Sequence, residues 1–208
     1  MVAVLNWFPL DPKAGANFQQ TITVVNSQGS GATALSAITG QTGYELPAAP
    51  FALGERQQGN NNSLWVFVKA SSTVTAGNLV AIDEQYNANN LTSTFAASLR
   101  FGVGIAQFFN PGLGSGSIQS TANQFTAQPG DFFWAAEQGQ GLSVNIVATG
   151  AANSQLFVSS TTPGSVGTAA STASVRGLFV GTTAFTVQAS GNNSTVDITA
   201  IVPIAPST

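Results

Sequence analysis

Short runs of β-branched and aromatic residues recur along this chain, and each run is bounded by Gly, Pro, Asn or Ser. β-Branched and aromatic side chains fit a pleated sheet, whereas the bounding residues favour turns. Near the C-terminal end, Val196, Ile198 and Ala200 alternate with polar residues, which gives a strand with one apolar face. The sequence therefore predicts an all-β protein. The predicted strands are residues 18–25, 64–69, 79–83, 102–108, 132–136, 142–148, 156–159, 178–181, 184–189 and 195–202.

Two of these runs, residues 65–68 and 132–134, are apolar at every position. A strand that is apolar on both faces needs cover on both, from a second sheet or from another subunit. The expected architecture is a β-barrel-like or β-sandwich-like body of short antiparallel strands. Residues 32–38 have apolar side chains at helical spacing, but Gly31 and Gly40 flank them and make any helix marginal.

Residues 1–63 are predicted to form an extended N-terminal arm and linker, and residues 64–208 the barrel-like body. Residues 54–63 are all polar or glycine, which is typical of a linker with nothing to bury. The arm before them has too few apolar residues for a core of its own. We therefore expect its aromatic group to pack on a partner, and the candidate partner-binding residues are Trp7, Phe8, Pro9 and Phe18.

The body contains two weak internal echoes. Residues 76–82 resemble residues 129–135, because each begins with a Gly-Asn or Gly-Asp turn that leads into an apolar run. Residues 100–106 resemble residues 176–181 in the same general way. Either a duplicated turn-plus-strand unit or the common recurrence of such turns in β proteins explains these echoes.

Charged residues make up 6% of the chain, against about 25% in an ordinary domain. Gln, Asn, Ser, Thr and Gly supply the polarity instead, and such a surface tolerates close packing with neighbours. The five basic residues are scattered singly and the net charge is −3, so we expect no nucleic-acid partner. No apolar run approaches the ~20 residues that span a bilayer, and no basic segment precedes the apolar N-terminal run, so we expect neither membrane insertion nor a signal peptide.

The chain has no histidine and no cysteine. Ser-His-Asp triads, cysteine nucleophiles and His- or Cys-ligated metal sites are therefore excluded. Asp83 and Glu84 are adjacent carboxylates, but neighbouring side chains at a strand end point to opposite faces and do not converge. Asp131, after Gly130, is interpreted as a turn residue. We expect no catalytic residues, no metal and no cofactor, and hence no enzyme.

The body resembles the capsid decoration, or cement, proteins of tailed bacteriophages. The resemblance lies in the turn-strand of residues 74–80, the run 102–106, the Gly130-Asp131 turn with its strand, and residues 175–178, and it covers about two thirds of the chain. It implies a β-barrel-like body on the outer surface of an assembled head, made in the host cytoplasm and commonly a homotrimer. It also implies that the N-terminal arm pins neighbouring subunits of the major capsid protein, so that many contacts stabilise the lattice.

A tail-fibre or receptor-binding module, or a carbohydrate-binding module, remains the alternative. Such a protein shares the amide-rich and hydroxyl-rich composition, and tryptophan rings stack on sugars. Trp65 and Trp134 lie inside apolar runs, so we expect them in the core, while Trp7 is the tryptophan expected to be exposed.

Overall fold

The computed structural model describes residues 18, 21–24, 44–46, 49–60, 62–92, 102–107, 126–147, 155–167, 174–180 and 194–204. Within these residues every regular element is a strand, which confirms the predicted all-β, barrel-like body. The marginal helix candidate at 32–38 and the predicted strand at 184–189 lie outside the described residues. The strands are β1 Thr21–Val24, β2 Tyr44–Leu46, β3 Arg56–Gly59, β4 Ser63–Ala70, β5 Val74–Thr75, β6 Leu79–Ile82, β7 Asn87–Asn90, β8 Gly102–Ala106, β9 Thr126–Ala127, β10 Phe132–Ile146, β11 Gln155–Val158, β12 Val166–Gly167, β13 Ser174–Val180 and β14 Ser194–Ile204.

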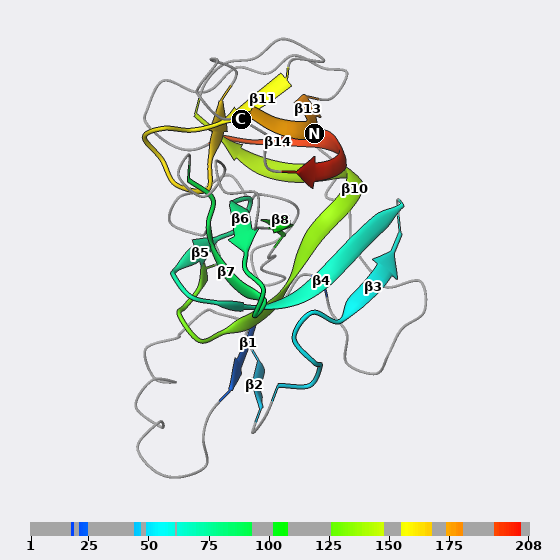
Figure 1. Cartoon of the computed structure of the whole chain (residues 1–208), viewed down its shortest axis with the longest axis vertical. Coiled ribbons are helices and arrows are strands. Elements are labelled where there is room, and N and C mark those ends of the chain that lie inside the picture. The colour runs from blue at the N-terminus through cyan, green and yellow to red at the C-terminus, as the bar shows by residue number, and fades with distance from the viewer. Residues whose placement is uncertain are drawn as a thin grey trace, which may run out of the picture.

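Five strands close into a barrel in the order β4, β10, β8, β6, β7 and back to β4 (Figure 1). Every pairing in this first barrel is antiparallel except β4 with β7, which is parallel and closes it. One buried cluster takes side chains from all five strands and therefore fills the interior. The barrel residues in this cluster are small or β-branched, except for Phe133. They are Val66, Val68, Ala70, Val80, Ile82, Ala88, Ala106, Phe133 and Ala135.

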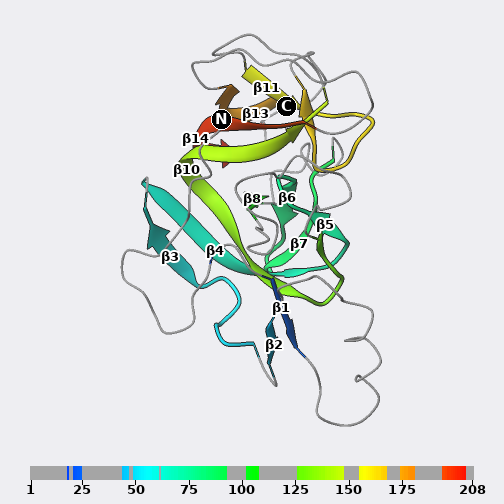
Figure 2. The ribbon, with the colours of Figure 1, turned by 180° about the vertical axis from the view of Figure 1, so that it is seen from behind.

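A second ring of five strands shares β10 with the first barrel. It runs β10, β14, β13, β11, β12 and back to β10, and it again closes through one parallel pairing, β10 with β12. The first barrel uses the N-terminal half of β10 and the second ring uses the C-terminal half, from Gly139 to Ile146. Figures 1 and 2 show the two groups of strands at opposite ends of this long strand.

The two rings repeat one pairing scheme, strand for strand and in the same chain order. β4, β6, β7, β8 and β10 of the first barrel correspond to β10, β11, β12, β13 and β14 of the second ring. The registers correspond as well. The pair Ala70–Ala88 of the first barrel matches the pair Ile146–Val166 of the second ring. In the same way, Ile82–Ala88 matches Val158–Val166. Finally, Ile105–Ala136 matches Phe179–Thr199.

The interiors follow the same correspondence. Interior residues of the first barrel have buried apolar counterparts in the second ring. Val66, Val68, Ala70, Val80, Ile82 and Ala88 match Leu142, Val144, Ile146, Leu156, Val158 and Val166. Because the pattern of pairing, register and buried side chains repeats, the chain contains a structural duplication.

The two sequence echoes have different origins. In the second echo, residues 102–106 lie on β8 and residues 176–180 on β13, which are corresponding strands. The strand pairings match Ile105 with Phe179, whereas the sequence echo aligns Ile105 two residues further along. The other echo is the chance recurrence of a common turn and not part of the duplication. Gly77 and Gly130 both have positive φ in similar turns, but these turns precede β6 and β10, which are not counterparts.

Two sequence predictions were wrong about strand boundaries. The predicted strand 132–136 and residues 142–146 of the predicted strand 142–148 belong to one strand, β10, because register shifts near Glu137 and Gly141 accommodate the glycine-containing segment between them. Residues 54–63 are not a linker, because Arg56–Gly59 form β3 and pair with β4 in a hairpin. The expected boundary between residues 63 and 64 therefore falls inside that hairpin.

A buried amide network joins the two rings. Asn145 of β10 is fully buried, and its Nδ2 donates to the carbonyl of Ala76 at 2.8 Å and to Oδ1 of Asn78 at 2.7 Å. The Asn78 Nδ2 in turn donates to Oδ1 of Asn90 at 2.8 Å. A Cβ at Gly77, whose φ is +82°, would meet the Asn145 Oδ1 at 2.9 Å. The turn before β6 is thus fitted to a side chain of the strand that both rings share.

Candidate partner-binding surface

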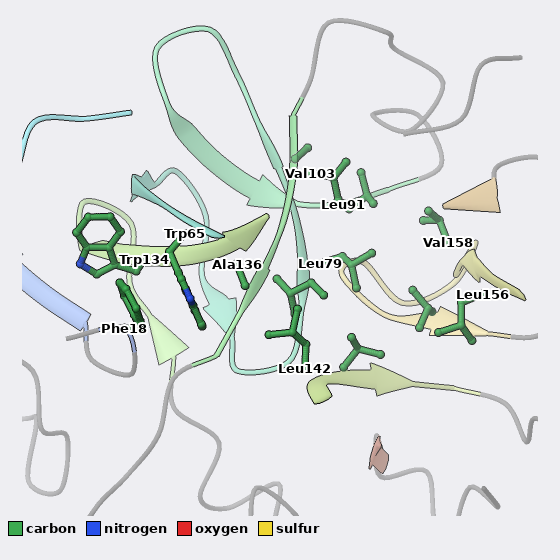
Figure 3. Packing of buried hydrophobic residues seen from close by; sticks show 14 of the residues in the cluster. Phe18, Trp65, Leu79, Leu91, Val103, Trp134, Ala136, Leu142, Leu156 and Val158 are labelled. Carbon is green, nitrogen blue, oxygen red and sulfur yellow. The ribbon is translucent and has the colours of Figure 1, made fainter. Parts of the chain in front are cut away.

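Phe18 lies in the core of the body and not on its surface. Its side chain is fully buried, and its ring stacks on Trp65 with centroids 4.6 Å apart and contacts Trp134 edge-on at 5.6 Å (Figure 3). The Cβ position of Gly59 is 2.8 Å from the Phe18 ring, so a side chain at Gly59 would displace it. The expectation that Phe18 binds a partner was wrong, because the partner of this ring is the chain's own barrel.

The other three candidate residues, Trp7, Phe8 and Pro9, lie outside the described residues. Trp65 and Trp134 have the predicted core positions and are both fully buried. They belong to an apolar layer on the outside of the first barrel, which Phe18 and Phe51 cover. Segments that precede the barrel in sequence therefore complete its core.

The two aspartates with described contacts shape turns. Asp83 Oδ1 accepts from the backbone amides of Gln85 at 2.9 Å and Asn87 at 2.8 Å. Asp131 Oδ2 accepts from the backbone amide of Gln128 at 2.7 Å, which confirms the interpretation of Asp131 as a turn residue. Glu84 is exposed beside Asp83. These hydrogen bonds give both aspartates a structural role.

Within the part of the chain that the structure describes, no three Asp or Glu residues gather in a group that could hold a metal ion. The same residues contain no helix of the length and hydropathy that crossing a bilayer requires.

The most elaborate surface feature is a corner formed by Gly54, Arg56, Tyr86 and Glu137, which we call the Tyr86 corner. Tyr86 has a φ of +60°, an uncommon conformation for a bulky residue. Its counterpart in the second ring is Gly164, with a φ of +78°. The turn therefore demands positive φ in both rings, and in the first barrel a tyrosine meets that demand at a cost of about 1–2 kcal/mol.

The tyrosine gains contacts in return. Together with Glu137, which has the larger effect, it helps to raise the pKa of Arg56. Arg56 also donates to both carboxylate oxygens of Glu137, at 2.7 Å and 2.9 Å. These hydrogen bonds raise the pKa of Arg56 above its ordinary value, so the pair stays charged. Because Arg56 is 49% exposed, we assign the ion pair only about 0.2–1 kcal/mol.

Sequence reasoning did not find this corner. Arg56 and Glu137 are 81 residues apart, and residues 54–63 had been interpreted as a linker. The one local signal was the Gly-Glu-Arg sequence itself, which does not identify a partner.

Gly54 and Tyr86 should show strong energetic coupling. A Cβ at Gly54, whose φ is +80°, would lie 2.2 Å from the Tyr86 ring. Gly54→Ala is expected to lower the free energy of unfolding by at least about 2 kcal/mol in the wild type. In a Tyr86→Gly background there is no ring for the new Cβ to clash with, so Gly54→Ala should lower the free energy of unfolding by only about 1 kcal/mol. Urea denaturation of the four proteins measures this, and equal costs in both backgrounds would contradict the contact.

Gln57 on β3 offers a second stability test. Its side chain is 7% exposed, and neither Oε1 nor Nε2 has a hydrogen-bond partner among the residues that the structure describes. Gln57→Leu should therefore leave stability unchanged or raise it by about 1 kcal/mol, since it removes two unsatisfied polar atoms. The matched control is Gln58→Leu at the next, exposed position, which should give no gain. A loss above about 1 kcal/mol for Gln57→Leu would show that the amide is satisfied.

Comparison with known proteins gave no family model that matches the chain and no curated protein that matches it.

Proposed function

We propose that this protein is a virion structural protein that decorates the outer surface of a capsid and stabilises it by bridging neighbouring major capsid subunits. The observation that carries the proposal is the position of Phe18. This residue is locked between Trp65 and Trp134, so the segment before it starts from a fixed point on the body.

That segment has the length and chemistry of a tether. Trp7 is eleven residues before Phe18, and an extended chain of that length spans up to about 36 Å. Trp7 and Phe8 would each bury about 150–250 Å² on a partner. In this proposal Phe18 roots the arm on the body, and Trp7 and Phe8 form its aromatic end.

The body suits repeated close contact. Charged residues are 6% of the chain, and the described exposed positions outside the Tyr86 corner are largely amides, hydroxyls and small residues. Such a surface meets neighbours without a large desolvation cost for ions. Many copies with modest individual contacts would then stabilise a lattice through multivalency.

The receptor-binding or carbohydrate-binding alternative has less support. Trp65 and Trp134, the two tryptophans among the described residues, are fully buried and offer no ring face to a sugar.

The experiment compares the full chain with a variant that lacks residues 2–16, a deletion that stops short of Phe18. Both are incubated with expanded, undecorated phage heads and sedimented, and light scattering gives the mass of each free protein. We expect saturable binding by the full chain as a trimer, and at least tenfold weaker binding by the truncated protein at unchanged melting temperature. Phe18→Leu, which leaves the arm intact, is the control and should bind like the wild type. Absence of binding by the full chain would overturn the proposal.

A further inference from the structure

β3 lies at an end of the large sheet, outside both rings. Among the described strands it pairs with β4 alone, so within that part of the chain its second edge has no neighbour. Figures 1 and 2 show β3 beside β4, with β4 between it and β10. A free edge presents backbone N–H and C=O groups with which another strand can pair.

The backbone groups at this edge belong to Arg56 and Gln58. Phe67 of β4 faces β3, because its backbone N–H and C=O both bond to the residues just before β3, each at 2.9 Å. Hydrogen-bonded and non-hydrogen-bonded pairs alternate along an antiparallel ladder. Trp65, two residues before Phe67, therefore also faces β3, and its partner there is Gln57. Arg56 and Gln58, on either side of Gln57, point their N–H and C=O groups away from β4.

The side chain between these two residues lacks hydrogen-bond partners. Gln57 is 7% exposed, and neither atom of its amide has a partner in the described part of the chain. A primary amide carries two donors and an acceptor, so two such amides can satisfy each other in a reciprocal pair. A second Gln57 is thus a partner with the required chemistry, and a second copy of β3 supplies it together with strand-pairing groups.

We propose that two copies of this chain pair through β3, antiparallel and centred on Gln57. Arg56 of one copy then lies opposite Gln58 of the other, and these residues exchange backbone hydrogen bonds. The two Gln57 residues form the close pair of the ladder, with Cα atoms about 4.5 Å apart, and their amides bond to each other. A ladder centred on Arg56 would place like charges opposite each other. One centred on Gln58 would place Gln57 opposite Gly59, which has no side chain to meet its amide.

Charge and symmetry are both compatible with this contact. Arg56 is already paired with Glu137 of its own chain and lies opposite a neutral glutamine. The contact is isologous, so it joins copies in pairs, and it is compatible with a threefold contact elsewhere on the body. Since β3 has four residues, we expect weak association in solution. The pairing does not depend on the proposed function, but on a decorated lattice it would link neighbouring copies of the decorating protein across two-fold axes.

The test traps the pair with a disulfide. The chain has no cysteine, so a single introduced thiol reports on one contact. Gln57→Cys places two thiols at the close pair, where the Cα separation lies within the range of about 4.4–6.8 Å that disulfides span. Gln58→Cys is the matched control. Its position is the more exposed of the two, but its two copies are diagonal neighbours with Cα atoms about 7–8 Å apart, which is too far for a disulfide.

Both full-length variants are oxidised at equal concentration and followed on non-reducing gels. We expect Gln57→Cys to form a covalent dimer at least about tenfold faster than Gln58→Cys. Adding Gln58→Pro to Gln57→Cys should slow dimer formation to the control rate, because proline removes the outward N–H without breaking a bond to β4. Gln58→Thr in the same background keeps the N–H and should leave the rate unchanged. Melting temperatures verify that each variant is folded.

Two results would overturn the proposal. If Gln58→Cys forms dimers as fast as Gln57→Cys, the ladder is not centred on Gln57. If Gln57→Cys stays monomeric, or forms dimers at a rate that Gln58→Pro does not change, the copies do not pair through β3. Every measurement is made on the free protein without heads, so these failures are separate from a failure of capsid decoration.

Discussion

Replacing Phe18 with alanine is expected to lower the free energy of unfolding by roughly 3–5 kcal/mol, the range for a buried aromatic ring in a core that cannot collapse around the cavity. The cavity would be walled by two large rigid rings, Trp65 and Trp134, and by the backbone of Gly59. None of these moves inward without breaking strand pairing. The substitution also removes the stacked contact with Trp65, worth about 0.5–1.5 kcal/mol beyond area burial.

Urea denaturation followed by tryptophan fluorescence measures this directly, since both tryptophans that touch Phe18 report on the site. Phe18→Leu keeps most of the apolar volume and should cost less than about 1.5 kcal/mol. A loss below about 1 kcal/mol for Phe18→Ala would mean that the ring does not occupy the core in solution. The result also decides how the arm is truncated, because a deletion that includes Phe18 would confound lost binding with lost stability.

Replacing Asn145 with leucine should lower the free energy of unfolding by about 2–5 kcal/mol. The leucine fills a similar volume but cannot donate, so the carbonyl of Ala76 and Oδ1 of Asn78 are left buried without the hydrogen bonds they now accept from Asn145. Each unsatisfied buried acceptor costs about 1–3 kcal/mol.

Thermal and urea unfolding give the magnitude, and a double-mutant cycle of Asn145→Ala with Asn78→Ala isolates the contact between the two amides. A coupling energy of about 0.5–3 kcal/mol is expected for side chains in one network. Asn89→Ala is the control, because Asn89 is half-buried on β7 and its amide has no hydrogen bond within the described residues. Additive effects in the cycle would show that the network does not join the rings.

The strands that the sequence predicted are those of four or more residues with several apolar side chains of their own. β4, β6 and β8 are apolar runs, and burial alone identifies them. β3 and β7 were missed because their sequences, RQQG and NANN, contain only polar residues, one glycine and one alanine. Their neighbours supply the stability through ladder hydrogen bonds, and no local propensity scale contains that information.

Sequence reasoning identified the aromatic residues that matter but not their partners. Phe18 is apolar in a weakly apolar region, and composition cannot distinguish a ring that binds another chain from one that binds its own barrel. The Tyr86 corner depends on a contact across 81 residues and on a bulge residue, Glu137, so nothing local predicts it. The duplication was visible only as a faint echo, because the interior positions that repeat require only apolar residues and not particular ones.

The sharing of β10 also determines how the molecule comes apart. Two domains joined by a linker can open about a hinge or melt one after the other, but here the removal of either ring takes a wall from the other. The two rings should therefore constitute one cooperative unit, with a single calorimetric transition and a common level of amide-exchange protection along β10. Under mechanical force such a protein should unfold as one unit, since the strand that connects its two halves is part of both.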